Sequence, residues 1–130
     1  MKRDLRKVRR IARAARKWAE EYAESVGAFS DLMCLCAISS AELHKRLRKE
    51  KQPSILVENN THCFVMCDDY VVDITATQFG IQEEVYIRKH DHSAVKNKYF
   101  YRINNKFRSV KKLREHQKKE GWPRDQIALP

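Results

Sequence analysis

The 130-residue sequence contains no long uninterrupted run of apolar residues. A membrane-spanning helix needs roughly 20 of them in succession. No apolar stretch follows the basic N-terminus, as it would in a secretory signal. Internal repeats and low-complexity segments are also missing. We therefore expect a protein without membrane contact that is located in the cytoplasm.

Positive charge is missing from the middle of the chain. Residues 52–87 contain no lysine or arginine, although they include six acidic residues. The formal net charge of +10 arises at the two ends: residues 1–17 carry nine basic residues against one acidic residue, and residues 106–124 carry eight against two. A basic surface attracts nucleic acid and other polyanions, but it is also the ordinary solvated face of a helix. Contact with nucleic acid or with an acidic protein is therefore one interpretation of these ends.

The bulk composition is typical of a folded globular protein. Hydrophobic residues make up 42% of the chain and charged residues 34%, whereas disordered chains combine few apolar residues with high net charge. We expect one domain over residues 1–130, with its core at about residues 28–108.

The chain has four cysteines: Cys34, Cys36, Cys63 and Cys67. We expect them to be reduced in the cytoplasm, although their even number leaves a disulfide open.

Apolar residues at helical spacing predict three helices. Gly27 favours the end of the first helix, and Ser30 and Asp31 are residue types that favour the start of the second. Arginine and lysine side chains cover the outer side of the first helix. The predicted helices span residues 3–26, about 33 or 36 to 49, and about 109–120.

Short runs rich in β-branched and aromatic residues predict five strands. They span residues 54–58, 61–67, 70–76, 84–88 and 98–103. The second and third form a hairpin with Asp68 and Asp69 at its tip, and Asn104 and Asn105 form a turn. These elements predict an α+β fold in which a small antiparallel sheet packs against the second helix, with basic helices at the N- and C-terminal ends.

The hairpin register decides which side chains share a face. Pairing Cys67 with Tyr70 places His62 and Asp73 on the same face, as diagonal neighbours. Such neighbours lie roughly 7–8 Å apart at the backbone, within reach of an imidazole and a carboxylate. A slip of one residue would separate them. Asp73 lies in the apolar run VVDIT, where a carboxylate needs a partner, and the register makes His62 that partner.

A thiol, an imidazole and a carboxylate in the order Cys36, His62 and Asp73 are the parts of a cysteine nucleophile with its base and its orienting residue. The thiolate is the reactive form, and a neighbouring imidazolium or a helix start stabilises it. The start of the second helix also offers backbone N–H groups to a developing oxyanion. We expect Asp73 to contact one ring nitrogen of His62 and the Cys36 thiol to lie near the other.

Several alternatives remain open for these residues. Cys36 and His62 are each also compatible with a buried structural role, and Cys34 is a rival nucleophile. A zinc site would draw on the Cys34-x-Cys36 pair with His62 and two further cysteines, but the spacing is unusual for zinc, and we expect no metal. We expect the remaining histidines to be solvated: His44, His90, His92 and His116.

The order of these motifs resembles the transglutaminase-like branch of the papain-like cysteine peptidase superfamily. The segment HCFVMCDDYVVDITATQF (residues 62–79) looks like the histidine and aspartate strands of that branch, and DITATQF is especially similar to small bacterial and phage members. The segment LCAISSAELHKRL (residues 35–47) resembles their nucleophile helix. The similarity covers about residues 30–80. It implies Cys36 as nucleophile, His62 as base and Asp73 as orienting residue.

Two positions depart from the family pattern. Phe64 stands where tryptophan is usual, and Cys34 stands where a small residue is expected before the nucleophile. The oxyanion side chain that papain-like enzymes supply upstream of the cysteine has no clear counterpart. The superfamily includes peptidases, amidases, acyltransferases, crosslinking enzymes and inactive members, so the fold does not choose among them.

We expect a thiol-dependent enzyme that acts on a protein or peptide amide through a thioester on Cys36 and needs no cofactor. The product of the second step is left open between hydrolysis, deamidation and transamidation. The alternative is a catalytically silent binding module whose basic surface engages nucleic acid or an acidic protein. The sequence leaves the oligomeric state open.

Overall fold

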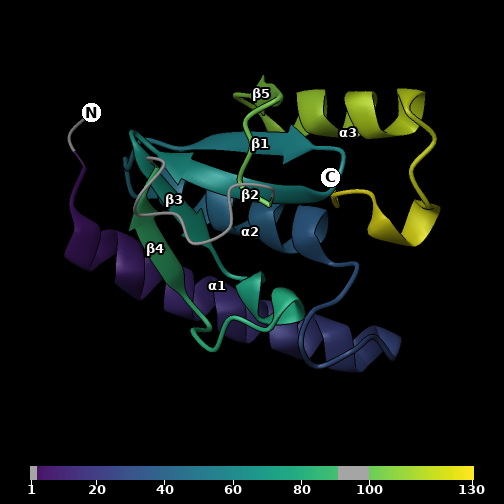
Figure 1. Cartoon of the computed structure of the whole chain (residues 1–130), viewed down its shortest axis with the longest axis horizontal. Coiled ribbons are helices and arrows are strands. Elements are labelled where there is room, and N and C mark those ends of the chain that lie inside the picture. Colours follow the sequence, from purple (N-terminus) through teal and green to yellow (C-terminus); the bar gives the residue numbers. More distant parts are fainter. Residues whose placement is uncertain (1–2, 91–99) are drawn as a thin grey trace.

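The computed structural model describes residues 3–90 and 100–130 (Figure 1). Over these residues the chain is an α+β protein with three α-helices and one five-stranded antiparallel sheet. The helices are α1 (Leu5–Val26), α2 (Cys36–Lys49) and α3 (Val110–Lys119). The strands are β1 (Ile55–Asn59), β2 (His62–Cys67), β3 (Tyr70–Asp73), β4 (Tyr86–Lys89) and β5 (Asn105–Phe107), in the spatial order β4-β3-β2-β1-β5.

Helix α1 has clear start and stop signals. The Asp4 carboxylate accepts hydrogen bonds from the backbone N–H groups of Arg6 and Lys7, so the helix begins at Leu5 rather than at residue 3. Gly27 ends it with a φ of 71°, a left-handed conformation that glycine adopts at little cost. One stripe of the helix is buried and consists largely of alanine, which lets α1 pack close to its neighbours.

Helix α2 begins at Cys36, and the predicted caps Ser30 and Asp31 are wrong. Asp31 instead accepts a hydrogen bond from the backbone N–H of Met33 in a local turn. Leu32 and Cys34 then take left-handed conformations, with φ values of 67° and 69°, so a helix is interrupted before residue 36. Leu35 occupies the N-cap position and makes no capping hydrogen bond with its side chain. The first N–H groups of α2 are therefore not capped by a side chain.

The two faces of the sheet bury different clusters. In Figure 1, α2 lies behind the sheet, α1 runs below it, and α3 lies at the top beside β5. Helices α1 and α2 pack on one face, against a cluster that includes Cys63, Val65 and Val72. The opposite face buries Phe64, Met66 and other large side chains. The alternation along β2 therefore divides the core as the sequence predicts.

The predicted hairpin register is confirmed by the pairs Cys67–Tyr70 and Val65–Val72. Strand β3 ends at Asp73 rather than at residue 76, because the chain turns into a 3-10 helix at Ala76–Phe79. The pairing of β2 with β3 stops at Val65 and Val72, so no ladder bond joins the start of β2 to the end of β3. The site described below lies at this unpaired end.

The predicted strand at residues 98–103 is wrong over its described part, and its first two residues lie outside the described ranges. Residues 100–103 form no strand; β5 occupies residues 105–107, where a turn was predicted at Asn104 and Asn105. The Asn59 side-chain amide donates hydrogen bonds to the carbonyls of Phe100 and Arg102. Because a side chain satisfies these carbonyls, the segment crosses the sheet without joining its ladder.

None of the helices in the described ranges combines the length and apolarity that a membrane-spanning helix needs.

Replacing Asp4 by alanine should destabilise the protein, because two N–H groups at the start of α1 lose their acceptor. We expect the free energy of unfolding, measured by urea denaturation, to fall by about 1 kcal/mol. Asp125→Ala removes an equal charge from an exposed position near the C-terminus and should change it by less than about 0.5 kcal/mol. Equal stability of the Asp4→Ala variant and the wild type would contradict the capping role.

Candidate functional site

The site is centred on a hydrogen bond between His62 and Asp73. The ring nitrogen Nε2 of His62 lies 2.7 Å from Oδ2 of Asp73, and both side chains are fully buried. His62 is the first residue of β2 and Asp73 the last of β3, so the hairpin register brings them together. The predicted contact between these two side chains is confirmed.

Asp73 accepts three further hydrogen bonds. Its Oδ1 accepts from the backbone N–H of Thr75 at 2.8 Å and from the Thr75 hydroxyl at 3.1 Å. Its Oδ2 also accepts from the hydroxyl of Tyr101 at 2.8 Å. Both carboxylate oxygens are therefore satisfied, as burial of a charge requires.

The sequence did not reveal the role of Tyr101. It is fully buried and reaches Asp73 from 28 residues further along the chain. In the sequence, Tyr101 is only one member of an aromatic run that predicts a strand. A buried tyrosine needs a partner for its hydroxyl, but only the path of the chain over the sheet decides which one.

Electrostatics favour a charged His62–Asp73 pair. Burial tends to raise the pKa of Asp73, but the His62 charge and the hydrogen bonds from His62, Thr75 and Tyr101 lower it overall. Burial tends to lower the pKa of His62. The Asp73 charge and hydrogen bond, together with the nearby Cys36 thiol, outweigh burial and raise that pKa from 6.5 to about 10. At neutral pH the pair is therefore an imidazolium and a carboxylate.

Aromatic side chains surround the His62 ring. Phe79 packs edge-on at 4.7 Å between ring centroids, Tyr101 packs edge-on at 5.8 Å, and Phe64 stacks at 5.8 Å. These contacts and the bond to Asp73 leave the imidazole one orientation. The second ring nitrogen, Nδ1, has no hydrogen-bond partner among the described residues, although it is buried.

Cys36 lies close to this ring. It is the first residue of α2, and its interaction with His62 is one of the causes of the raised imidazole pKa. One turn later, the Ser40 hydroxyl donates a hydrogen bond to the Cys63 carbonyl on β2, which fixes α2 against the strand next to His62. The thiol raises the His62 pKa partly through a hydrogen-bonding contact, but the contact is too loose to satisfy Nδ1. Loose contacts of this kind are common in catalytic sites without substrate.

Of these three residues, only Cys36 is reached by solvent. Cys36 is 8% exposed, whereas His62 and Asp73 are each 0% exposed. A cleft of about 330 Å³ lies beside the start of α2 and is lined by residues that include Cys34 and Leu35. The exposed large apolar side chains of the described residues, Val26, Phe29 and Met33, all line it.

The other cysteines have different surroundings. All four cysteines are free thiols, so no disulfide is present. Cys34 is exposed, while burial raises the pKa of Cys63 and raises that of Cys67 to about 12. Cys67 donates a hydrogen bond to the Pro53 carbonyl. In the described ranges, no group of three or more His, Cys, Asp and Glu side chains is arranged so that it could hold a metal ion, so the zinc ligands considered from sequence do not form a set.

The expectation of solvated histidines is wrong for His44. It is 4% exposed, its ring nitrogens contact the Ser54 hydroxyl and the Arg108 carbonyl, and burial lowers its pKa. His90 and His116 are half-buried: the first bonds the Tyr101 carbonyl, and the second bonds Glu58. These histidines tie the segment after residue 100 to the body of the protein. His92 lies outside the described residues.

Comparison with models of known protein families, with curated proteins and with solved structures finds no match to the chain. The resemblance to the transglutaminase-like branch remains a prediction.

Replacing Asp73 by asparagine should lower the pKa of His62 from about 10, because the imidazolium loses its counter-charge. NMR titration of the ring nitrogens measures this pKa directly. Asp68→Asn, at the exposed hairpin tip, is the matched control and should leave the His62 titration unchanged. An unchanged His62 pKa in Asp73→Asn would contradict the charged pair.

The same pair makes the stability of the fold depend on pH. Since the folded-state pKa of His62 is raised from 6.5 to about 10, its contribution is complete below about pH 6.5 and is lost as the pH rises through about 10. Urea denaturation at pH 6 and pH 10 should therefore show a wild-type advantage over Asp73→Asn that shrinks at the higher pH. An advantage that grows with pH would contradict this sign.

Removing only the hydroxyl of Tyr101 should leave Asp73 Oδ2 with one donor instead of two. We expect Tyr101→Phe to lower the free energy of unfolding by about 1–3 kcal/mol. Tyr22→Phe, on a half-buried tyrosine that stacks on Trp18, is the control and should change it by less than about 0.5 kcal/mol. Equal losses in the two variants would mean that the Tyr101 hydroxyl contributes nothing specific to the site.

Proposed function

We propose that the protein is a thiol-dependent enzyme that acts on protein or peptide amides through a thioester on Cys36. The observation that carries this proposal is the buried His62–Asp73 pair, which leaves one ring nitrogen without a partner beside the thiol. A purely structural histidine would be expected to use both nitrogens. A histidine that exchanges a proton with a thiol needs one nitrogen that is not engaged by another partner.

The first half of the reaction forms the thioester. In the reactive site the proton of the Cys36 thiol lies on Nδ1 of His62, as part of the imidazolium that Asp73 stabilises, and the thiolate sulfur attacks the amide carbonyl. The carbonyl oxygen becomes an oxyanion, and the N–H groups at the start of α2, which no side chain caps, are positioned to donate to it. The C–N bond then breaks, and the proton on Nδ1 moves to the departing amine.

The second half releases the acyl group. Water or an amine loses a proton to Nδ1 and attacks the thioester carbonyl. The sulfur–carbon bond breaks, Cys36 leaves as the thiolate, and the proton taken up by Nδ1 restores the imidazolium. Asp73 stays ionised throughout and holds the imidazole in one orientation. Attack by water gives hydrolysis or deamidation, and attack by an amine gives transamidation.

The resemblance to the transglutaminase-like branch supports the same roles. It places Cys36, His62 and Asp73 at the nucleophile, base and orienting positions, and the family's chemistry is amide hydrolysis or acyl transfer. Because members with this fold differ in activity, the buried pair and the neighbouring thiol carry the proposal, and the resemblance adds to them.

Selective alkylation tests the proposal. If His62 activates Cys36, iodoacetamide at near-neutral pH should modify Cys36 more slowly in His62→Gln than in the wild type, by at least about tenfold. Mass spectrometry of the separate cysteine peptides measures the rates. The exposed Cys34, two residues away, is a control within the same molecule, and its rate should not change.

The buried Cys63 and Cys67 should stay unmodified in the folded protein. A variant that merely unfolds would expose them, so their labelling separates loss of structure from loss of activation. The proposal fails if Cys36 reacts at the same rate in the wild type and in a folded His62→Gln variant.

A further inference from the structure

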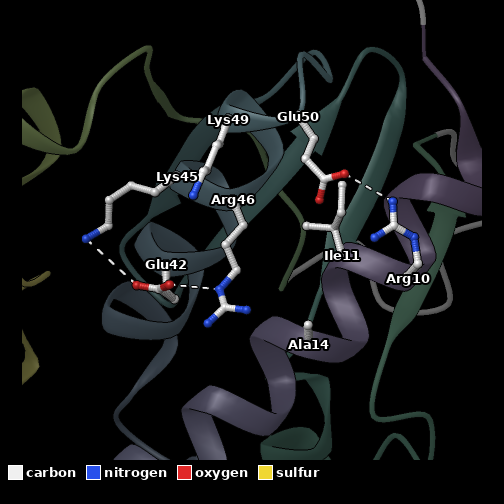
Figure 2. Close-up of a pocket in the computed structure, with 8 residues that line it drawn as sticks. All are labelled: Arg10, Ile11, Ala14, Glu42, Lys45, Arg46, Lys49 and Glu50. Atoms are coloured by element: carbon white, nitrogen blue, oxygen red, sulfur yellow. Dashed lines mark hydrogen bonds and ion pairs between the residues drawn. The ribbon is translucent and has the colours of Figure 1, made fainter.

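A second site lies between α1 and α2, away from Cys36. A groove of about 680 Å³ runs between the two helices, with Ile11 and Ala14 on its floor and charged side chains on its walls (Figure 2). The charged residues are Arg10, Glu42, Lys45, Arg46, Lys49 and Glu50. We infer that this groove binds the phosphate backbone of duplex nucleic acid without sequence preference.

Cations outnumber carboxylates in and around the groove. Glu42 contacts both Lys45, at 3.8 Å, and Arg46, at 2.8 Å. Glu50 contacts both Arg10, at 3.1 Å, and Lys7, at 3.9 Å. Each carboxylate therefore holds two cations side by side, and an excess of positive charge remains to attract an anion.

Two of the cations are placed to contribute most to that attraction. Lys49 forms no ion pair with another described residue. It lies beside Lys45 and Arg46 (Figure 2). Arg46 uses only Nε to contact Glu42, and its terminal nitrogens point into the groove (Figure 2). A guanidinium with free N–H groups is well suited to phosphate oxygens.

The charge continues from the groove along α1. From Leu5 to Ala19 the helix contains no acidic residue. The exposed side chains at steps of four, three and four residues share one side of the helix: Arg6, Arg10, Arg13 and Lys17. They therefore recur about once per helical turn of 5.4 Å. A row of evenly spaced cations suits a polymer with regularly repeating charge.

The lining of the groove favours duplex nucleic acid over other partners. Protein interfaces depend on buried aromatic or other large anchors, and no aromatic side chain lines this groove. Single-stranded nucleic acid is bound largely by stacking of bases on aromatic rings, which this lining also lacks. The lining therefore suits a partner that it contacts through phosphates alone, and a duplex presents phosphates continuously on its outside.

The groove is separate from the proposed catalytic site. Cys36 begins α2, whereas the lining residues of α2 lie between Glu42 and Lys49. Ten residues of helix separate Cys36 from Arg46, which corresponds to about 15 Å along the axis. Binding in the groove therefore does not depend on the thiol, and this inference stands whether or not the enzyme proposal holds.

Fluorescence anisotropy with a labelled duplex DNA of about 20 base pairs and mixed sequence tests the inference. Affinity should fall steeply with salt, because each phosphate contact releases about 0.9 counterions. The variant Arg10→Gln/Arg46→Gln/Lys49→Gln should bind at least about tenfold more weakly, and its salt slope should be smaller by about 3. A second duplex of unrelated sequence should bind equally well.

A matched variant removes the same charge elsewhere. Lys111→Gln/Lys118→Gln/Lys119→Gln changes three exposed lysines on α3, which lies beside β5 at the top of Figure 1, whereas α1 runs below the sheet. The α3 variant should keep most of the affinity, and so should Cys36→Ala. Circular dichroism and urea denaturation confirm that each variant is folded.

Three outcomes would overturn the inference. Equal weakening in the groove and α3 variants would mean that net charge alone attracts DNA. Binding of poly-glutamate as tight as that of the duplex would point to an acidic protein as partner. No measurable binding of the folded wild type at low salt would mean that the groove is only a solvated surface.

Discussion

The structure depends on the burial of one carboxylate. Asp73 is fully buried inside an apolar sheet, and an ionised carboxylate there is costly unless it is paired and hydrogen-bonded. Its partners come from three separate parts of the chain: His62 on the neighbouring strand, Thr75 just after β3, and Tyr101 after β4. The hairpin, the 3-10 turn and the segment that crosses the sheet must all be in place before this charge is satisfied. Asp73 therefore links local folding to the completion of the tertiary structure.

The same carboxylate organises the chemistry around it. Because Asp73 fixes Nε2 of His62, the ring turns its other nitrogen away from the carboxylate, and that nitrogen has no partner among the described residues. The ladder between β2 and β3 ends before His62 and Asp73, so a helix packed on the other face can bring Cys36 to the imidazole at the end of the sheet. Ser40 sets this approach by bonding the β2 backbone. The site is thus a consequence of where the sheet stops, as well as of which residues it contains.

Charge divides the molecule into two parts with different chemistry. Residues 52–87 carry no lysine or arginine and build the buried pair. Helix α1 and the second half of α2 carry closely spaced cations on the surface. Two proposals follow from two separate features: the enzyme rests on a desolvated ion pair, and the nucleic-acid groove rests on an exposed cationic surface. The distance between Cys36 and the groove allows both to operate in one small domain.

The sequence by itself determined the features that depend on neighbours in the chain. The stripe of α1, the hairpin register and the diagonal placement of His62 and Asp73 follow from helical and strand periodicity. Only the tertiary structure decided that Tyr101 completes the site, that His44 is buried, and that residues 100–103 cross the sheet instead of joining it. The physical reason is range. Periodicity records which side of an element is apolar, whereas the partner of a buried hydroxyl or imidazole is set by packing between segments that are distant in the sequence.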